Sequence, residues 1–205
     1  MKKIVAVGFY DDFARFFLRI KKELKKKEKL SFHYLSIYPS GFIYSIMRLN
    51  RSSLISFLMW FKLILNKKKY LKLCHSKNYK GVDIDEVIFY HVKLDSKKSL
   101  LYRIIALAYI DLIDDFFKKH KIDIVILSGD TRVSIEVINK LAKKYNVRTY
   151  YFEQGPFNTT ILDDVGVNAN CSFRKRNNYV SKISIKNKEI VLKKFLSNKR
   201  KKYNR

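Results

Sequence analysis

Cysteine and histidine are scarce in this sequence. Of its 205 residues, two are cysteines, Cys74 and Cys171, and four are histidines. Two cysteines are too few for a disulfide framework, and neither belongs to a C-x-x-C pair. Because cysteine and histidine do not cluster, the sequence predicts no metal site. Low cysteine use is typical of proteins in the reducing cytosol, which is the compartment that we expect.

A long apolar run is also lacking. The longest run, residues 54–65, has 12 residues and contains Lys62, whereas a transmembrane helix needs about 20 apolar residues. The apolar run near the N-terminus ends at Asp11 and Asp12, which is too early for the core of a signal peptide. We therefore expect neither a transmembrane helix nor a signal peptide.

Basic residues lie on both sides of the longest apolar run. Arg48 and Arg51 precede it, and residues 67–69 are three lysines. Residues 54–65 are therefore either an amphipathic helix that packs on a core or a helix that lies on a membrane surface. From the sequence alone we favour the first interpretation, because it is the more common arrangement.

Three motifs of common enzyme classes are absent. The chain has no G-x-G-x-x-G dinucleotide loop and no Walker A loop, whose glycines let the backbone approach phosphates closely. It also has no G-x-S-x-G, so a nucleophile-elbow hydrolase would lack its central serine. Any chemistry must therefore come from other residues.

Acidic residues are few in comparison with basic ones. Asp and Glu number 18 against 44 Lys and Arg, a net charge of +26, and 33 of the basic residues are lysines. This profile fits A/T-rich codon bias as well as selection for a polyanionic partner. An anionic membrane would attract each well-placed basic residue by roughly 1 kcal/mol. Nucleic-acid binding relies on arginine forks and aromatic platforms, and because no such motif is visible, nucleic acid is the less expected partner.

Short apolar runs alternate with helical repeats along the chain. Strands are expected at residues 3–9, 30–38, 87–92, 122–127 and 147–152. Helices are expected at residues 13–24, 42–73, 99–120 and 133–145, the first capped by Asp11 or Asp12 and the second preceded by a Pro39-Ser40-Gly41 turn. Residues 122–152 read as a βαβ unit. We predict an α/β fold, a Rossmann-like parallel sheet flanked by helices, over residues 1–173, followed by a basic tail over residues 174–205 with a short helical pattern.

Parallel α/β sheets bind ligands beyond the carboxyl ends of their strands. That rule places Gly8, residues 128–130 and residues 153–155 on the functional rim. Asp163 and Asp164 follow Glu153 after about ten residues, and carboxylates at such a rim can act as base, nucleophile or substrate ligand. Alternatively, residues 163–166 form a simple hairpin turn and Glu153 is a capping or ion-paired residue.

A family resemblance favours the first of these two interpretations. Residues 151–168, Tyr-Phe-Glu-Gln-Gly-Pro-Phe-Asn-Thr-Thr-Ile-Leu-Asp-Asp-Val-Gly-Val-Asn, resemble the signature of bacterial capsular polysaccharide biosynthesis proteins, the β-Kdo glycosyltransferase group. Those proteins have a strand ending in Glu-x-Gly and then a Leu-Asp-x-x-Gly-Val-Asn-like segment. Residues 128–132, Ser-Gly-Asp-Thr-Arg, are similar to the family's upstream loop. The resemblance covers residues 122–173, and residues 1–121 agree only in general α/β order.

The resemblance implies the N-terminal half of a GT-B glycosyltransferase, in which two Rossmann-like halves face a cleft. It implies transfer of a sugar, Kdo from the donor CMP-Kdo, to a lipid-linked saccharide acceptor, without a metal or another cofactor. It also implies a cytoplasmic protein that is peripheral to the inner face of the cell membrane. Asp163 matches the family's catalytic acidic residue, and Asp164 takes that place if the register shifts by one. Glu153 and Arg132 match positions on the acceptor side of the cleft.

The rim and the resemblance together give the substrate-binding candidates. These are Gly129, Arg132, Glu153, Gln154, Gly155 and Asn168. Asn168 is also expected, with Gly166, to shape its loop.

The chain departs from the family at its C-terminal end. The nucleotide-sugar site of such enzymes lies mostly in a C-terminal half, and a 32-residue tail is too short for a second Rossmann domain. We therefore expect a truncated product, an inactive relative, or half of a split enzyme whose partner is a separate C-terminal half or another capsule-assembly protein. Whether the chain is itself an enzyme stays open.

Two alternatives do not need glycosyl transfer. Residues 174–205 carry 13 basic residues and one acidic residue, so the chain can be a non-catalytic basic module that binds an anionic membrane or nucleic acid. The α/β pattern by itself also suits a nucleotide-binding domain of another enzyme class.

Overall fold

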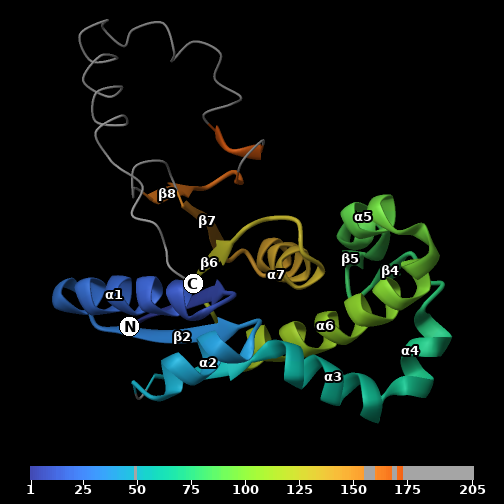
Figure 1. The fold of residues 1–205 in the computed structure, drawn as a ribbon, viewed down its shortest axis with the longest axis horizontal. Coiled ribbons are helices and arrows are strands. Elements are labelled where there is room, and N and C mark those ends of the chain that lie inside the picture. Colours follow the sequence, from blue (N-terminus) through green and yellow to red (C-terminus); the bar gives the residue numbers. More distant parts are fainter. Residues whose placement is uncertain (49, 155–159, 168–169, 173–205) are drawn as a thin grey trace, which may run out of the picture.

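A six-stranded sheet forms the centre of the molecule. The computed structural model describes residues 1–48, 50–154, 160–167 and 170–172 (Figure 1). The strand order is β3-β2-β1-β6-β7-β8, with β1 (Lys2–Gly8), β2 (Leu30–Ser36), β3 (Ser52–Leu54), β6 (Ile124–Ser128), β7 (Arg148–Gln154) and β8 (Thr160–Asp163). All neighbouring strands are parallel except β7 and β8. A separate hairpin pairs β4 (Asn78–Tyr79) with β5 (Val82–Asp83).

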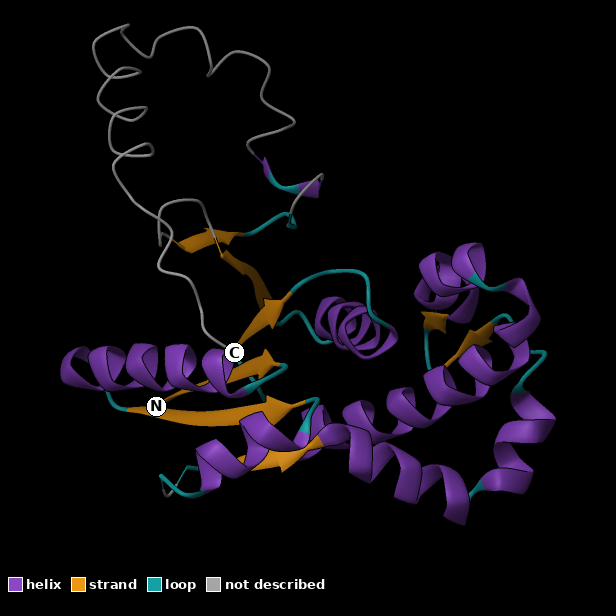
Figure 2. Ribbon diagram, in the orientation of Figure 1, coloured by secondary structure: helices purple, strands orange, loops and turns teal. Residues whose placement is uncertain are grey.

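Helices flank this sheet (Figure 2). The helices are α1 (Asp11–Lys27), α2 (Pro39–Ile46), α3 (Ile55–Leu65), α4 (Lys67–Leu73), α5 (Ile84–Leu94), the 3-10 helix η1 (Ser96–Lys98), α6 (Ser99–His120) and α7 (Val133–Lys144). Of these, α4 and α5 pack on α6 and lie away from the sheet. The arrangement confirms the predicted α/β class with a Rossmann-like, mostly parallel sheet. The further likeness to half of a GT-B enzyme remains a prediction, and the predicted tail, residues 174–205, lies outside the described residues.

The central strands are apolar because helices cover both of their faces. Val5 and Val7 of β1 belong to the core that includes α6 and α7. Ile4 and Ala6 alternate with them and belong to the smaller core that includes α1. Side chains of a strand alternate between the two faces of its sheet, so one short apolar run supplies both cores.

The predicted strand at residues 87–92 is wrong, because these residues lie within helix α5. Asp83 caps this helix by accepting hydrogen bonds from the backbone N–H groups of Asp85 and Glu86. Ile84, Val87 and Ile88 are buried, and the spacing of three and four residues places them on one helical face. The β-branched and aromatic composition favoured a strand, but the cap and the helical packing decide the structure.

Three other local predictions are corrected as well. Residues 42–73 are not one helix, because strand β3 separates α2 from α3 and Asn66 ends α3 before α4. Residues 39–41 are not a turn but the start of α2, where Pro39 suits the first helical turn. Tyr10 occupies the N-cap position of the first helix without a capping hydrogen bond from its side chain, and Asp11 and Asp12 lie in the first turn instead of capping it. The helix predicted at residues 99–120 is confirmed with the same bounds.

The strand order changes direction between β1 and β6. From β1 the chain proceeds to β2 and β3 on one side, and it later returns to add β6 and β7 on the other side. Ligands of open α/β sheets bind at the carboxyl ends of strands at such a topological switch point. The fold therefore directs attention to the residues that follow β1 and β6.

Candidate functional site

A cleft of about 290 Å³ opens at the topological switch point. It is lined by Phe9, Phe13, Ser128, Gly129, Phe152, Glu153, Gln154 and Val167. Most of these residues follow or end β1, β6 and β7, whereas Phe13 lies in the first turn of α1 and Val167 in the loop after β8. The volume lies just below the range for small-molecule sites, which begins at roughly 300 Å³. The cleft therefore suits a small ligand, or one part of a larger ligand.

Gly129 forms the turn at the end of β6. Its φ of +93° lies in the left-handed region, which glycine adopts without the steric cost that a side chain would bring. A Cβ atom at this position would meet no other atom within 4 Å, so the surrounding space is open. The neighbouring Ser128 Oγ donates a hydrogen bond of 2.7 Å to the Val7 carbonyl, which ties β6 to β1 beside the cleft.

Three phenylalanine rings form an aromatic wall of the cleft. The Phe9 and Phe13 rings meet edge to face with centroids 5.5 Å apart, and the Phe13 and Phe152 rings do so at 5.9 Å. Ligand pockets combine such apolar surfaces with a few polar groups that set orientation. Glu153 and Gln154 supply polar side chains here, and Glu153 is only partly exposed.

Arg132 lies beside the cleft and is held by aromatic residues. Its guanidinium is 4.5 Å from the centre of the Phe9 ring, and Nη1 donates a hydrogen bond of 2.8 Å to the Tyr38 hydroxyl. Tyr38 in turn stacks on Tyr10 with ring centroids 4.8 Å apart. A guanidinium has five N–H donors, and no ion pair joins Arg132 to any acidic residue in the described part of the chain. Arg132 can therefore bind an anionic group that occupies the cleft.

Asp163 is buried, with 5% of its surface exposed. Its Oδ1 accepts hydrogen bonds from the Val165 and Gly166 N–H groups, and its Oδ2 accepts hydrogen bonds from the N–H and hydroxyl groups of Ser172. Burial alone would raise the pKa of Asp163, but the hydrogen bonds from Ser172, Val165 and Gly166 lower it below its ordinary value. These bonds fix the loop after β8 and occupy both carboxylate oxygens. The catalytic role that the resemblance implies for Asp163 stays a prediction.

Asp130, in the loop after β6, also holds the loop after β8. Its Oδ2 accepts hydrogen bonds from the Val167 N–H at 3.3 Å and from the Asn170 side chain at 2.8 Å. Val167 lines the cleft, so Asp130 and Asp163 together position part of its wall. A Cβ atom on Gly166 would lie 2.8 Å from the Asn170 Cβ, which fits the expected role of Gly166 in shaping the loop.

The predicted residues divide into three groups. Gly129, Glu153 and Gln154 line the cleft, and Arg132 lies beside it. Neither Asp163 nor Asp164 contributes to the lining, since Asp163 is buried and Asp164 is exposed outside the cleft. Gly155 and Asn168 lie outside the described residues.

The sequence did not identify the aromatic wall. Phe9, Phe13 and Phe152 resemble core residues in any apolar pattern. Only Phe9 directly follows a strand, because Phe13 lies in helix α1 and Phe152 lies within strand β7. The sequence placed residues 128–130 on the functional rim, but it did not indicate that Asp130 holds the loop after β8. Among the residues that the structure describes, no cluster of His, Cys, Asp and Glu could hold a metal ion.

A larger cleft of about 610 Å³ lies beside α5 and α7. Its lining includes Glu86 and Lys140, which form an ion pair with each other. None of its lining residues belongs to the six-stranded sheet, so the switch-point cleft is the stronger candidate for a ligand site.

Comparison with known proteins adds no assignment. No protein-family model, curated protein or solved structure matches the chain. The functional argument therefore rests on the fold, the cleft and the sequence motif.

Proposed function

We propose that this chain is a glycosyltransferase-like protein of surface or capsular polysaccharide biosynthesis that binds a saccharide in the switch-point cleft. The observation that carries the proposal is the position of Gly129, Glu153 and Gln154, which line a cleft at the carboxyl edge of a mostly parallel sheet. The motif at residues 151–168 supports the same function. A peripheral location at the inner face of the cell membrane, where a lipid-linked acceptor would be reached, is part of the proposal.

Each side of the cleft has a distinct role in this proposal. The aromatic wall of Phe9, Phe13 and Phe152 packs against the C–H groups of the sugar. Glu153 and Gln154 form hydrogen bonds with its hydroxyl groups. Arg132 binds a carboxylate or a phosphate, because charge-assisted hydrogen bonds are the stronger ones. A sugar acid such as Kdo supplies a carboxylate for that contact.

Transfer from CMP-Kdo would exchange one bond at the anomeric carbon of Kdo. The bond from this carbon to the CMP phosphate oxygen breaks, and CMP leaves with the electron pair. An acceptor hydroxyl oxygen forms the new bond and gives up its proton to a base. Asp163 is the acidic residue that the resemblance assigns to catalysis. To accept this proton at Oδ2, Asp163 must first release its hydrogen bonds from Ser172.

Titration of the purified chain with CMP-Kdo and with a Kdo-containing saccharide tests the binding site. We expect one of these ligands to bind and Glu153→Gln to weaken binding by about tenfold, the effect of losing one charged hydrogen bond. Glu23→Gln is the matched control, because Glu23 is exposed on α1 and pairs with Lys26. Absence of binding by both ligands, or equal binding by the two variants, would refute the proposed site.

A further inference from the structure

The outer face of helix α3 is apolar and open to solvent. Only Ile55 and Met59 of this helix are buried. Six large apolar side chains are exposed, namely Phe57, Leu58, Trp60, Phe61, Ile64 and Leu65; we call this set the α3 apolar face. With 3.6 residues per turn it spans roughly 160° of the helix circumference, and it contains no charged residue. Large exposed apolar patches mark interaction sites.

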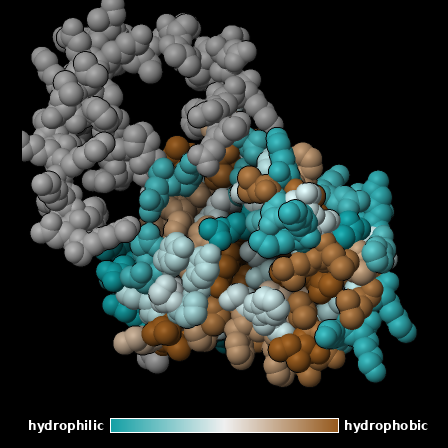
Figure 3. Space-filling view, turned by 45° about the vertical axis from the view of Figure 1, so that its right-hand side comes forward, coloured by the Kyte–Doolittle hydropathy of each residue, from teal (hydrophilic) through white to brown (hydrophobic). Residues whose placement is uncertain are grey.

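Neighbouring helices extend this surface. Ile43, Ile46 and Met47 are exposed at α2 and its C-terminal end, and Leu71 is exposed on α4. Apolar residues gather along the lower edge of the molecule in Figure 3, where Figure 1 places α2 and α3, and α4 continues from the end of α3. The surface is therefore wider than a single helix.

Positive charge lies directly beside the α3 apolar face. Lys67, Lys68 and Lys72 of α4 are exposed, and none of them forms an ion pair with a described residue. The two other lysines of this region differ, since Lys62 pairs with Asp115 and Lys69 with Asp111. The charge that stays available for a partner is thus positive.

We propose that α3 and α4 dock this protein on the surface of an anionic lipid bilayer. The α3 apolar face would enter the boundary between headgroups and acyl chains, and the α4 lysines would contact anionic headgroups. No described helix is long and apolar enough to cross a membrane. An 11-residue helix instead lies along the surface, as interfacial amphipathic helices do.

The charges favour a bilayer over a second copy of the chain. A two-fold symmetric dimer places the same patch of both subunits against each other. That arrangement would bring two sets of unpaired α4 lysines together. Protein interfaces are also depleted in lysine, whereas an anionic bilayer offers many negative headgroups to a lysine cluster.

The docking surface begins at the sheet edge that carries the cleft. Helix α3 starts directly after the carboxyl end of β3, and the Ser56 hydroxyl fixes its first turn by donating to the Ile37 carbonyl at 2.6 Å. The inference rests on the proposed peripheral location and assigns α3 and α4 as the surface that contacts the membrane. A protein at the membrane surface can reach a lipid-linked acceptor. The test of this inference uses lipid alone, so it can fail while the saccharide site stands, and the reverse also holds.

Trp60 allows a direct test because it is the only tryptophan of the chain and belongs to the α3 apolar face. The full chain is mixed with vesicles of phosphatidylcholine and phosphatidylglycerol, some with brominated acyl chains. We expect the Trp60 emission to shift to shorter wavelength and the brominated lipid to quench it. Vesicles of phosphatidylcholine alone should bind much more weakly, and added salt should release the protein.

Two triple variants separate the apolar and the charged contributions. Phe61→Gln/Ile64→Gln/Leu65→Gln should lower vesicle partitioning at least tenfold. A tenfold loss is roughly what the burial of one apolar side chain contributes to binding. Lys67→Gln/Lys68→Gln/Lys72→Gln should lower it about 100-fold at low salt. Circular dichroism checks that both variants fold.

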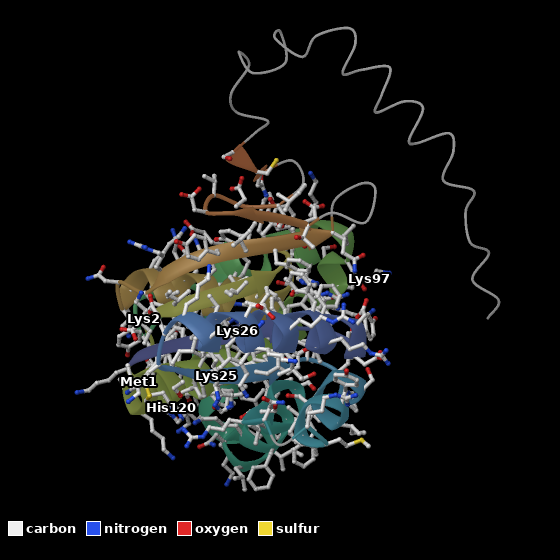
Figure 4. The ribbon with its side chains drawn as sticks, turned by 90° about the vertical axis from the view of Figure 1, so that its left-hand side faces the viewer. Met1, Lys2, Lys25, Lys26, Lys97 and His120 are labelled. Carbon is white, nitrogen blue, oxygen red and sulfur yellow. The ribbon has the colours of Figure 1, made fainter. Side chains whose placement is uncertain are left out.

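Matched controls lie elsewhere on the molecule. Phe89→Gln/Leu94→Gln/Leu100→Gln changes three exposed apolar residues near α5, which lies on the other side of α6 in Figure 1. Lys22→Gln/Lys25→Gln/Lys27→Gln removes the same charge from α1, where Figure 4 shows Lys25 at the surface. Both controls should partition like the unchanged chain.

Three results would overturn the proposal. The first is vesicle binding without quenching of Trp60. Binding of that kind would be assigned to the basic tail, residues 174–205, which no variant alters. The second is equal partitioning by the α3 variant and its α5 control. The third is a dimer, measured by light scattering, that the α3 variant dissociates while Trp60 stays insensitive to lipid.

Discussion

Asp163 and Ser172 are joined by two hydrogen bonds to one carboxylate oxygen, from the Ser172 hydroxyl at 2.6 Å and from its N–H at 3.0 Å. The other oxygen of Asp163 accepts the Val165 N–H at 2.7 Å. This pair closes the loop that carries Val167 into the wall of the cleft. The residue that the family resemblance assigns to catalysis thus has a visible structural task, and the two roles need separate tests.

The first prediction concerns stability. Asp163→Asn should lower the free energy of unfolding by about 1–3 kcal/mol, because an amide NH2 group would face N–H donors that need an acceptor. Ser172→Ala should cost about 1 kcal/mol, since only one of the bonds is lost. Chemical denaturation measures both values, and Asp164→Asn is the control because Asp164 is exposed. Equal stability of Asp163→Asn and Asp164→Asn would show that these bonds do not hold the loop.

A second prediction separates catalysis from loop closure. If the chain, alone or with a partner, transfers sugar, Asp163→Asn should abolish turnover while Ser172→Ala retains most of it. The reason is that Ser172→Ala keeps the carboxylate but loosens the loop. Equal losses in kcat for the two variants would assign Asp163 to loop closure only.

The third prediction uses two glycines with left-handed backbone. Gly129 and Gly81 have φ values of +93° and +80°, so replacement of either by alanine should cost about 1–3 kcal/mol of stability through backbone strain. Only Gly129 lines the cleft. Gly129→Ala should therefore weaken saccharide binding, and Gly81→Ala should leave it unchanged. If both variants bind equally well, the β6 turn is not part of the binding site.

The fourth prediction concerns His91, whose Nε2 accepts a hydrogen bond from the Val133 N–H at 3.3 Å. Burial and then the positive charge of Arg132 lower the pKa of His91, while the Thr131 backbone acts in the opposite direction. Arg132→Gln should therefore raise this pKa, as measured by NMR titration of the imidazole protons. Arg19→Gln, at an exposed site on α1, should not change it. An unchanged pKa in Arg132→Gln would place the guanidinium away from His91.

The fifth prediction gives a pH dependence of stability. Burial by itself would raise the pKa of Asp111, but hydrogen bonds from Lys69, Lys80, Tyr79 and Tyr70 lower it to about 2. An unfolded aspartate has a pKa of about 3.9, so the unfolded chain binds the proton more readily. The stability from this group is present above about pH 4 and is lost as the pH falls towards 2.

This loss should reach at most about 2 kcal/mol, since Lys69 is partly exposed and solvent screens its charge. Denaturation curves between neutral and acidic pH measure it, and Asp111→Asn should flatten the dependence. Asp164→Asn should leave the dependence as it is. A slope that Asp111→Asn does not alter would rule out Asp111 as its source.

The sequence predicted the fold where apolar spacing was unambiguous. The run at residues 122–127, the repeat at residues 133–145 and the bounds of α6 follow from the burial of strand and helix faces. The segment at residues 87–92 failed because β-branched and aromatic residues also suit a helix that packs one face and is capped by Asp83. The division of residues 39–73 failed because strand β3 has only three residues, too few to show a period.

The candidate site was predictable only in part. Gly129 follows β6 and Glu153 lies at the carboxyl end of β7, so the rule for parallel sheets placed them at the cleft before the structure did. The Phe9 and Phe13 rings gave no such signal, because an apolar residue at a cleft and one in a core look alike in sequence. The hydrogen bonds of Asp163 join residues nine positions apart, and loop contacts of this kind follow no periodic pattern.

The most direct test is an amide NMR spectrum of the labelled chain, recorded while CMP-Kdo or a Kdo-containing saccharide is added. If the switch-point cleft binds sugar, the largest shifts will fall on Gly129, Glu153 and Gln154. Shifts confined to the helical cleft around Glu136 and Lys140, or no shifts with either ligand, would contradict a saccharide site at the carboxyl edge of the sheet.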